Sequence, residues 1–224
     1  MMVVLDTCTE RLIVGVRSGE HRDRWFNLDS QGNHARDIVP VIESLLRGAK
    51  PDVVGVALGP GSFTGVRIGL ATAKGLAEGW DIPMVGLDNL EAMAQAWSSL
   101  VPGSPAAVLS VIDARKKKFY GALYQAGKTL LPPADLAPEL WLDRIAGLWS
   151  GPVVLSGYQG NFLAQALGSA LPRDWSVLPV KDWTPGLLDQ AQSAWIEKRF
   201  LGPDAAPRYL RLSEAEENLQ QRSE

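Results

Sequence analysis

The chain has few of the side chains that usually mark catalytic or disulfide-linked proteins. Its 224 residues include one cysteine, Cys8, and two histidines, His21 and His34. A single cysteine cannot form an internal disulfide, which is typical of a protein from a reducing compartment. Neither histidine has an acidic partner that the sequence places beside it, so the sequence does not favour a serine hydrolase.

The chain also lacks a strong excess of charge and any long apolar segment. Lys plus Arg total 22 and Asp plus Glu total 25, and residues 214–224, with four Glu and one Arg, account for the whole net charge of -3. A nearly neutral folded part does not favour strong nucleic-acid binding by the chain alone. No apolar run reaches the roughly 18 residues of a membrane span, and the run before Asp6 is too short for a secretory signal. We expect a cytoplasmic protein without membrane contact, ending in a flexible acidic tail over residues 213–224.

The first hundred residues alternate between strand and helix patterns in the order βββαβαβα. An amphipathic helix is predicted from His34 to Arg47, because its apolar residues recur every three or four positions. The apolar face of that helix consists of Ile38, Val41, Ile42, Leu45 and Leu46. The continuous β-branched run from Asp52 to Leu58 is typical of a strand buried in a parallel sheet. A helix is also predicted from Asn89 to about residue 100.

A second unit follows a proline-rich and glycine-rich boundary at residues 102–105. The stretch AVLSVIDARKKKFYGALY resembles MVVLDTCTERLIVGV, since each is an apolar strand ending in Asp, a polar turn and an alternating strand. Asp113 thereby corresponds to Asp6, and the pattern indicates a weak internal repeat. We predict a first lobe over residues 1–101 and a shorter, less regular second lobe over residues 106–212, with the last helix packing back on the first lobe.

The stretch GPGSFTGVRIGLATAKGLAEG, Gly59 to Gly79, begins like a phosphate-binding turn but matches neither nucleotide-binding fingerprint. The third glycine of a dinucleotide-binding turn comes one residue late, at Gly65, and a P-loop would need Gly-Lys-Ser/Thr where the chain has Gly-Val-Arg. Ser62 lacks the flanking glycines of a nucleophile turn. The N–H groups at the helix start could bind an anion, or the glycines could serve turn geometry alone.

Small residues recur at every fourth position of this stretch. Such a row lets another element approach the helix closely, which offsets the cost of about 0.5 to 1 kcal/mol for each glycine in a helix interior. The row consists of Gly61, Gly65, Gly69, Ala73 and Ala77. The element packed against it is either part of the same chain or a helix of another chain, and the spacing does not decide between them.

Two aspartates and one basic run are weaker candidates. Asp6 and Asp113 each end a strand before a turn, where they could hold a metal-bound phosphate, although aspartates in such places more often form the turn itself. The run from Arg115 to Lys118 is foremost a hairpin turn and secondarily a candidate phosphate contact.

Several long stretches of the chain resemble the TsaB family, also called YeaZ. The resemblance rests on LDTCTE, on VVGVALGPGSFTGVRIGLATAKGLAEGWDIPMVGLDNLEAMA, on SVIDARKKKFYGALY and on PRYLR. Members of this family are bacterial subunits of the tRNA threonylcarbamoyladenosine machinery. The resemblance implies an α/β protein with an actin-like, Hsp70-like and sugar-kinase-like fold of two duplicated RNase H-like lobes, the second of them reduced.

The chain departs from TsaD, the catalytic relative of this family, at two sites. The metal-binding His-x-x-x-His pair of TsaD is replaced by Asn89 and Met93, so no metal is expected. The adenosine-binding turn of the relative keeps only Gly157 and Asn161, and Tyr158 would crowd a base. The resemblance leaves Asp6, Thr7, Asp113, Gly157 and Asn161 as vestigial nucleotide or phosphate positions. We expect no cofactor bound by the chain alone, and ATP or ADP only within a complex.

The resemblance implies a non-catalytic subunit that forms a heterodimer with TsaD and supports threonylcarbamoyl transfer to N6 of the adenosine beside the tRNA anticodon. TsaE is a further implied partner, and tRNA would bind through the complex. The interface is predicted on the small-residue row together with Ile38, Val41, Ile42 and Leu45. Two alternatives remain open at this stage. One is a free-standing ATP-dependent enzyme or peptidase of the same fold, and the other is a homodimer formed through the same helices.

Overall fold

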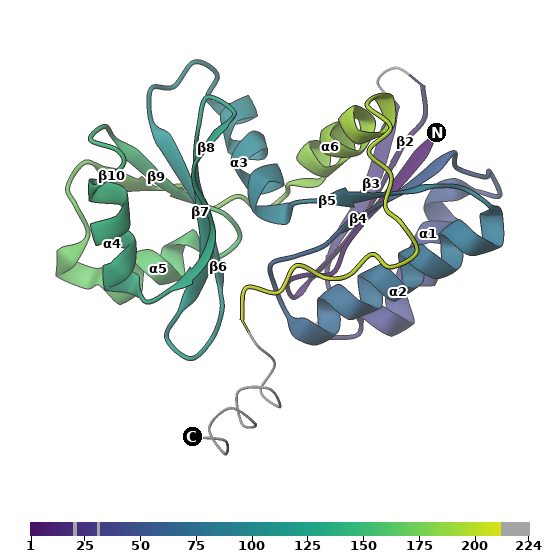
Figure 1. Cartoon of the computed structure of the whole chain (residues 1–224), viewed down its shortest axis with the longest axis horizontal. Helices are drawn as coiled ribbons and strands as arrows, with labels where there is room; N and C mark the ends of the chain where they lie inside the picture. The colour runs from purple at the N-terminus through teal and green to yellow at the C-terminus, as the bar shows by residue number, and fades with distance from the viewer. Residues whose placement is uncertain (20–21, 31, 212–224) are drawn as a thin grey trace.

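The computed structural model describes residues 1–19, 22–30 and 32–211, which form two lobes, each built on a five-stranded sheet (Figure 1). The expected acidic tail therefore lies outside the described residues. The elements of the first half are β1 (Met2–Asp6), β2 (Arg11–Arg17), β3 (Asp23–Asp29), α1 (His34–Leu46), β4 (Val53–Ala57), α2 (Phe63–Trp80), β5 (Met84–Leu87) and α3 (Asn89–Leu100). Those of the second half are β6 (Ala107–Asp113), β7 (Phe119–Gln125), β8 (Lys128–Leu136), α4 (Pro138–Ala146), β9 (Val153–Ser156), α5 (Gly160–Leu167), a short 3-10 helix (Gly168–Ala170), β10 (Trp175–Val177) and α6 (Thr184–Ile196).

The two sheets have the same topology. Their strand orders are β3-β2-β1-β4-β5 and β8-β7-β6-β9-β10. In the first sheet β1 is antiparallel to β2 and parallel to β4, and in the second sheet β6 has the same relation to β7 and β9. Asp6 and Asp113 end the two equivalent strands. The predicted duplication of an α/β lobe is therefore confirmed.

The second lobe is reduced in the length of its two outer helices rather than in the number of its strands. Helices α1 and α2 have 13 and 18 residues, whereas their counterparts α4 and α5 have 9 and 8. The sequence patterns did not predict β8, α4 or β10. Strand β8 contains Pro132 and Pro133, which disfavour a strand interior, and it lies at a sheet edge where proline is tolerated. Strand β10 has three residues, too few for a periodic signal.

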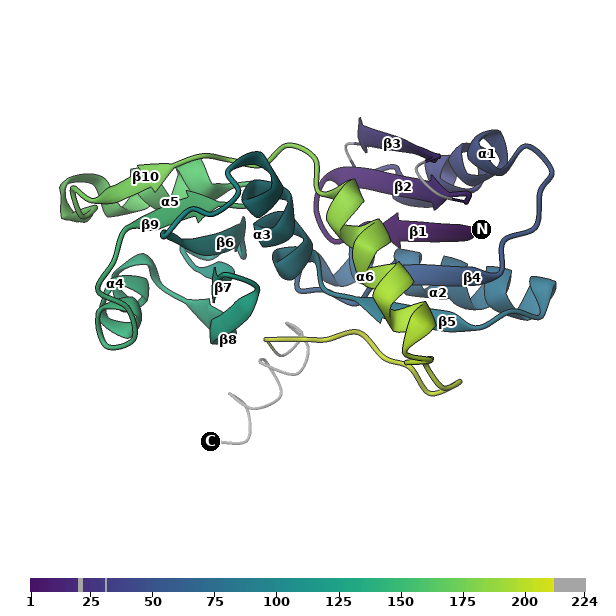
Figure 2. The same ribbon diagram turned by 90° about the horizontal axis from the view of Figure 1, so that it is seen from above.

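Helices α3 and α6 are exchanged between the lobes (Figure 2). Helix α6 packs on the first sheet, on the face opposite α1 and α2, while α3 packs on the second sheet and against α6. The division of the chain at residue 101 therefore needs correction, because α3 belongs by its contacts to the second lobe. A single apolar cluster that includes Met93, Trp97, Trp183 and Leu187 joins the two lobes.

The segment after α6 ties the two lobes together a second time. The Leu201 N–H donates to the Met84 carbonyl of β5 at 2.8 Å, and the Arg208 N–H donates at 2.7 Å to the carbonyl of Leu58, the residue after β4. Its end reaches the second lobe, where the Arg211 guanidinium pairs with Asp135 at 2.8 Å. Both side chains of that pair are mostly buried, which strengthens the link relative to an exposed ion pair. Within the described residues, no helix has the length and apolar character needed to cross a membrane.

The small-residue row of α2 faces the protein's own first lobe. A Cβ added at Gly65 would lie 2.1 Å from the carbonyl oxygen of Thr7, and one added at Gly69 would lie 2.4 Å from the Thr7 hydroxyl oxygen. A Cβ on Gly61 would lie 2.1 Å from the Cys8 carbonyl oxygen. The turn between β1 and β2 therefore packs directly against the glycines of the row. Any residue larger than glycine at these positions would collide with the turn.

Most residues of the predicted partner interface consequently lie in the interior of the first lobe. Ala73 and Ala77 are buried, and so are Ile38, Ile42 and Leu45 on α1, while Val41 is half-buried against the same cluster. These side chains form the core between the two helices and the first sheet. An amphipathic helix shows the same spacing whether its apolar face covers its own sheet or a partner, so the sequence could not distinguish them.

Two glycines of α2 should respond in opposite ways to the same substitution. We expect Gly65→Ala to lower the free energy of unfolding by about 2 kcal/mol, because its Cβ overlaps a backbone oxygen. Gly75 is exposed, and a Cβ there would meet nothing within 4 Å. Gly75→Ala should therefore raise the free energy of unfolding by roughly 0.5 to 1 kcal/mol. Urea denaturation of both variants measures the difference, and equal effects at the two positions would contradict this packing.

Candidate functional site

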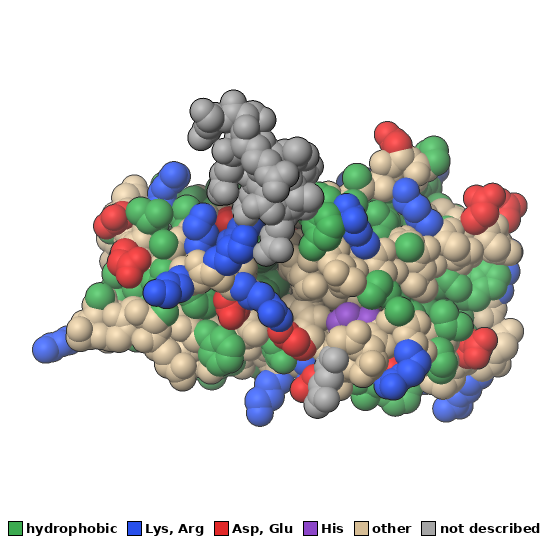
Figure 3. Space-filling model, turned by 90° about the horizontal axis from the view of Figure 1, so that it is seen from below, with side chains coloured by type: hydrophobic (Ala, Val, Ile, Leu, Met, Phe, Trp, Pro, Cys, Tyr) green, Lys and Arg blue, Asp and Glu red, His purple; other side chains and the backbone are tan. Residues whose placement is uncertain are grey.

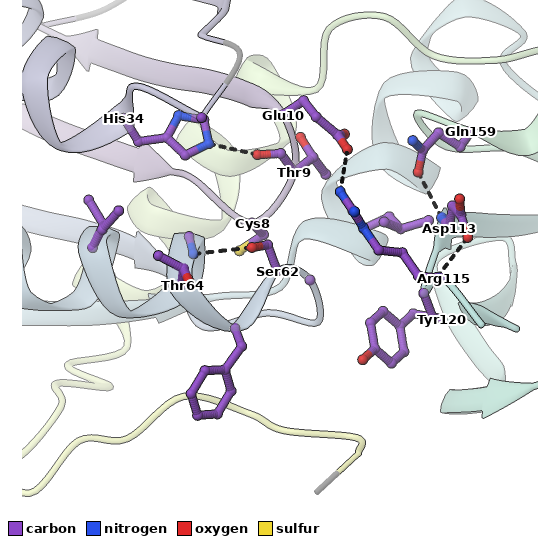
Figure 4. Close-up of a pocket in the computed structure, with 17 residues that line it drawn as sticks. Cys8, Thr9, Glu10, His34, Ser62, Thr64, Asp113, Arg115, Tyr120 and Gln159 are labelled. Atoms are coloured by element: carbon purple, nitrogen blue, oxygen red, sulfur yellow. Dashed lines mark hydrogen bonds and ion pairs between the residues drawn. The ribbon is translucent and has the colours of Figure 1, made fainter. Parts of the chain in front are cut away.

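A cleft of about 570 Å³ lies between the lobes, at the carboxyl ends of β1 and β6 (Figure 4). Three segments form most of its wall: the β1–β2 turn, the amino end of α2 and the β6–β7 turn. The carboxyl ends of parallel strands are the usual ligand-binding edge of open α/β sheets. We call this space the interlobe cleft.

Asp6 does not line the interlobe cleft. Its side chain is 1 % exposed, with Oδ1 accepting the Cys8 N–H at 2.8 Å and Oδ2 accepting the Trp183 Nε1–H at 2.7 Å. Burial raises the pKa of this carboxyl group above its ordinary value of 3.8, although the hydrogen bonds act in the opposite direction. Asp6 thus fixes the β1–β2 turn to the start of α6, and its side chain lies in the interior rather than in the cleft.

Thr7 likewise makes its interactions inside the first lobe. Its hydroxyl is buried and donates to the carbonyl of Gly65 at 2.7 Å. Ser62, at the start of the same helix, accepts the Gly65 N–H at 3.3 Å and so acts as the N-cap of α2. These bonds complete the contact between the β1–β2 turn and α2, and they engage the Thr7 hydroxyl inside the first lobe.

Asp113 does line the interlobe cleft, but its interactions are those of a turn residue. Its Oδ1 accepts the Arg115 N–H at 2.7 Å, and its own N–H donates to Gln159 Oε1 at 2.7 Å (Figure 4). Across the cleft, Glu10 of the first lobe forms an ion pair of 3.7 Å with Arg115 of the second, and both side chains are largely exposed. Exposed pairs of this kind contribute little to stability and are easily exchanged for another anion.

The remaining vestigial positions lie away from the cleft. Gly157 has a φ of 84°, and a Cβ there would lie 2.5 Å from the Val111 carbonyl oxygen, so packing against β6 accounts for this glycine. Tyr158 contacts Trp183 at 5.9 Å between ring centroids. Of the five predicted positions, only Asp113 contributes to the wall of the interlobe cleft, and Asn161 does not reach it.

The residues in place of the relative's metal ligands are part of the core. Asn89 and Met93 are both fully buried, and Asn89 Nδ2 donates to the Pro60 carbonyl at 2.9 Å. Asn89 therefore holds the turn that precedes α2. Among the residues that the structure describes, no cluster of three or more His, Cys, Asp and Glu side chains is arranged to hold a metal ion.

His34 is a cleft residue that the sequence did not assign. Its ring is buried, with Nε2 2.8 Å from the Thr9 carbonyl oxygen and Nδ1 2.7 Å from the Ser30 hydroxyl. Because a carbonyl oxygen only accepts, Nε2 carries a proton and donates to Thr9. In the sequence, only the position of His34 at the start of a predicted helix singles it out. Its partners, Ser30 and Thr9, lie in two turns that the sequence does not place beside it.

A second space of about 670 Å³ adjoins the cleft around the amino end of α2. We call it the cationic pocket, because its wall contains Arg67, Arg115, Lys116, Arg208 and Arg211. The sequence pointed to Arg115 and Lys116 in the basic run. It gave no role to Arg67, or to Arg208 and Tyr209 of the PRYLR motif, since only the path of the C-terminal segment brings them to α2.

The hydrogen bond from Trp183 to Asp6 should give a pH-dependent contribution to stability. Because folding raises the pKa of Asp6, the stabilisation linked to its protonated form is present at low pH and is lost as the pH rises through the raised pKa. Trp183→Phe removes a donor to the charged form, so we expect it to cost about 1 to 3 kcal/mol more at about pH 7.5 than at about pH 4.5. Urea denaturation at both pH values tests this.

The control for this measurement is the same substitution in an Asp6→Asn background. There the packing lost with the indole should cost the same at both pH values. A pH-independent penalty in both backgrounds would contradict the role of the hydrogen bond.

Comparisons with known proteins lead to two related kinds of protein, TsaD and TsaB. The family model of TsaD, tRNA N6-adenosine threonylcarbamoyltransferase, matches residues 29–167. The tRNA threonylcarbamoyladenosine biosynthesis protein TsaB of Escherichia coli (strain K12) is 33% identical over 162 residues, which span 66% of this chain and 68% of that protein.

Solved structures give the same result. A Pseudomonas aeruginosa protein, described as uncharacterized with similarity to peptidase YeaZ, superposes with a TM-score of 0.74 and 28% identity over 94% of this chain and 99% of its own. A Bacteroides thetaiotaomicron protein with an actin-like ATPase fold, 9% identical, has a TM-score of 0.50 over 84% of this chain and 95% of its own, which shows the fold. The chain therefore belongs to the TsaB, or YeaZ, family of tRNA threonylcarbamoyladenosine biosynthesis proteins, and its fold is actin-like.

Proposed function

We propose that this chain is a non-catalytic subunit that dimerises with TsaD and supports the transfer of a threonylcarbamoyl group to N6 of the adenosine beside the tRNA anticodon. TsaE joins the same assembly in this proposal, and tRNA binds through the complex. The names of the chain's relatives place them in threonylcarbamoyladenosine biosynthesis. We infer that TsaD carries out the transfer and that this chain supports TsaD without taking part in the chemistry.

One observation carries the non-catalytic role. The carboxyl group of Asp6, at the end of the central strand, is buried, and each of its oxygens accepts a hydrogen bond from its own chain, from Cys8 and from Trp183. A carboxylate buried in this way is unavailable to a metal-bound phosphate. Thr7 is used in the same manner by Gly65, and Tyr158 packs on the indole that caps Asp6. We therefore expect the isolated chain to bind neither ATP nor ADP, and assign nucleotide binding to the assembled complex.

The outer faces of α1 and α2 are the surface on which we place TsaD. These two helices lie on the same face of the first sheet, opposite α6 (Figure 1). Gly75 and Gly79 of α2 have open space where a Cβ would be, and neither has the positive φ that would require glycine. Ala71 is exposed on the same helix, and Val39 of α1 is 45% exposed. Close approach of a partner helix would offset the helix-destabilising effect of these glycines.

Reconstituted transfer tests the role directly. Threonylcarbamoyl transfer to tRNA is measured with TsaD, TsaE and the adenylate-forming protein from the same source, with and without this chain. We expect product only when the chain is present. Transfer at the same rate without the chain would refute the proposed function, and nucleotide hydrolysis by the chain alone would favour a free-standing enzyme.

The interface is tested by Gly75→Leu. Since a side chain at this position points into solvent, we expect the free chain to remain folded but to lose co-elution with TsaD in size-exclusion chromatography. Ala166→Leu is the matched control, because Ala166 is exposed on α5 of the second lobe. An intact complex with Gly75→Leu would place the partner on another surface, and light scattering of the free chain separates this interface from a homodimer through the same helices.

A further inference from the structure

The cationic pocket combines positive charge with flat aromatic surface. Five Arg and Lys side chains contribute to its wall, and no Asp or Glu is among the described residues that line it. Figure 3 shows Lys and Arg side chains gathering beside the boundary between the lobes on the face seen from below. This local concentration contrasts with the small net charge of the whole chain.

An arginine and two aromatic rings form a stack at the pocket wall. The rings of Phe63 and Tyr209 lie 4.9 Å apart between centroids with an interplanar angle of 27°. The guanidinium carbon of Arg67 lies 3.7 Å from the Phe63 ring centroid, and its Nε donates to the Tyr209 hydroxyl at 2.8 Å. Both rings remain exposed, at 37% for Phe63 and 42% for Tyr209. Aromatic rings presented in this way stack on nucleobases without regard to base identity.

The basic turn between β6 and β7 supplies the charge opposite this stack. Arg115, Lys116 and Lys117 have φ angles of 60°, 50° and 59°. Three successive non-glycine residues in the left-handed region are unfavourable by about 1 kcal/mol each or more. Glycine would relieve this strain but would remove the cationic side chains. The Arg211 Nη1 donates to the Ala114 carbonyl at 3.1 Å and so fixes the turn to the C-terminal segment that carries Tyr209.

The cations of the pocket differ in how firmly they are held. Arg208 and Arg211 are bound to Asp88 and Asp135, so their main role is to position the C-terminal segment. Arg115 has a side chain that is 84% exposed, and its ion pair with Glu10 is long, at 3.7 Å. A phosphate group can replace such a partner at little cost, since an exposed pair contributes little.

We propose that the cationic pocket binds an unpaired segment of RNA, with a base stacked on Tyr209 and the adjoining phosphates near Arg115 and Lys116. This inference rests on the proposed function, in which tRNA is bound by the complex. An RNA strand fits better than a free nucleotide, because the pocket is continuous with the interlobe cleft through Thr64, Arg115 and Tyr120 and so extends beyond one nucleotide. An acidic peptide would match the charge but would leave the aromatic stack unused.

The test measures fluorescence anisotropy of a labelled single-stranded RNA of about 12 nucleotides with the full-length chain at low salt. We expect Tyr209→Ala to weaken binding about tenfold, and Tyr209→Phe, which keeps the ring, to change it less than about threefold. The double variant Arg115→Gln, Lys116→Gln should reduce the slope of log affinity against log salt by roughly 1.4, the value for two lost phosphate contacts on a single strand.

A matched control removes the same charge elsewhere. Lys128 and Arg144 are exposed in the second lobe and do not line the cationic pocket, so the double variant Lys128→Gln, Arg144→Gln should leave the salt slope unchanged. Equal effects of the two double variants would overturn the inference. So would the absence of saturable RNA binding by the unaltered chain, or displacement of the RNA as effectively by ATP or by a hexaglutamate peptide.

The outcome is distinguishable from failure of the proposed function. The pocket variants leave the outer faces of α1 and α2 unchanged and should still co-elute with TsaD. If transfer requires this chain but the pocket variants bind RNA normally, the RNA site is wrong and the subunit role stands. If transfer proceeds without the chain, the subunit role is wrong whatever the pocket binds.

Discussion

The contact between the start of α2 and the β1–β2 turn determines the architecture of the first lobe. The Ser62 N–H donates to the Cys8 carbonyl at 2.7 Å, and the hydroxyl of Thr7 donates to the Gly65 carbonyl at 2.7 Å. Both bonds require the helix and the turn to approach more closely than side chains permit, which is why glycines occupy the contact. The adjoining Asp6 extends the same network to Trp183, where the chain returns from the second lobe.

That network has consequences for chemistry. The polar groups at the carboxyl end of β1 are satisfied within the chain, so a buried carboxylate that would suit a metal-bound phosphate instead fixes a crossover between the lobes. The same hydrogen bonds link Asp6 to the core between the lobes, because Trp183 belongs to the apolar cluster that spans both sheets. A subunit that presents surfaces to partners benefits from such fixed geometry, since little ordering is then required on binding.

Most of the first lobe could be predicted from the sequence, and less of the second. Long periodic segments such as those of α1 and α2 are predicted correctly as helices, because their apolar residues repeat at the helical period over several turns. Strand β8 is not predicted, because its two prolines are typical of a loop. The sequence also does not predict that α3 packs on the second lobe, because the exchange of α3 and α6 leaves no pattern within either helix. The Asp6 and Asp113 pattern did predict the duplication, since equivalent strands keep their terminal residue type even where helix lengths diverge.

The family, the two-lobed α/β fold and the need for close packing along Gly61, Gly65 and Gly69 all follow from the sequence alone. Small residues at a spacing of four show that something approaches a helix, and a long family motif identifies the protein. The identity of the approaching element becomes clear only in the folded chain, because the β1–β2 turn and a partner helix impose the same spacing on α2. The tertiary structure also brings Arg67, Arg115 and Tyr209 to one pocket. These residues come from α2, a hairpin turn and the C-terminal segment, and long-range contacts of that kind have no periodicity from which a sequence could predict them.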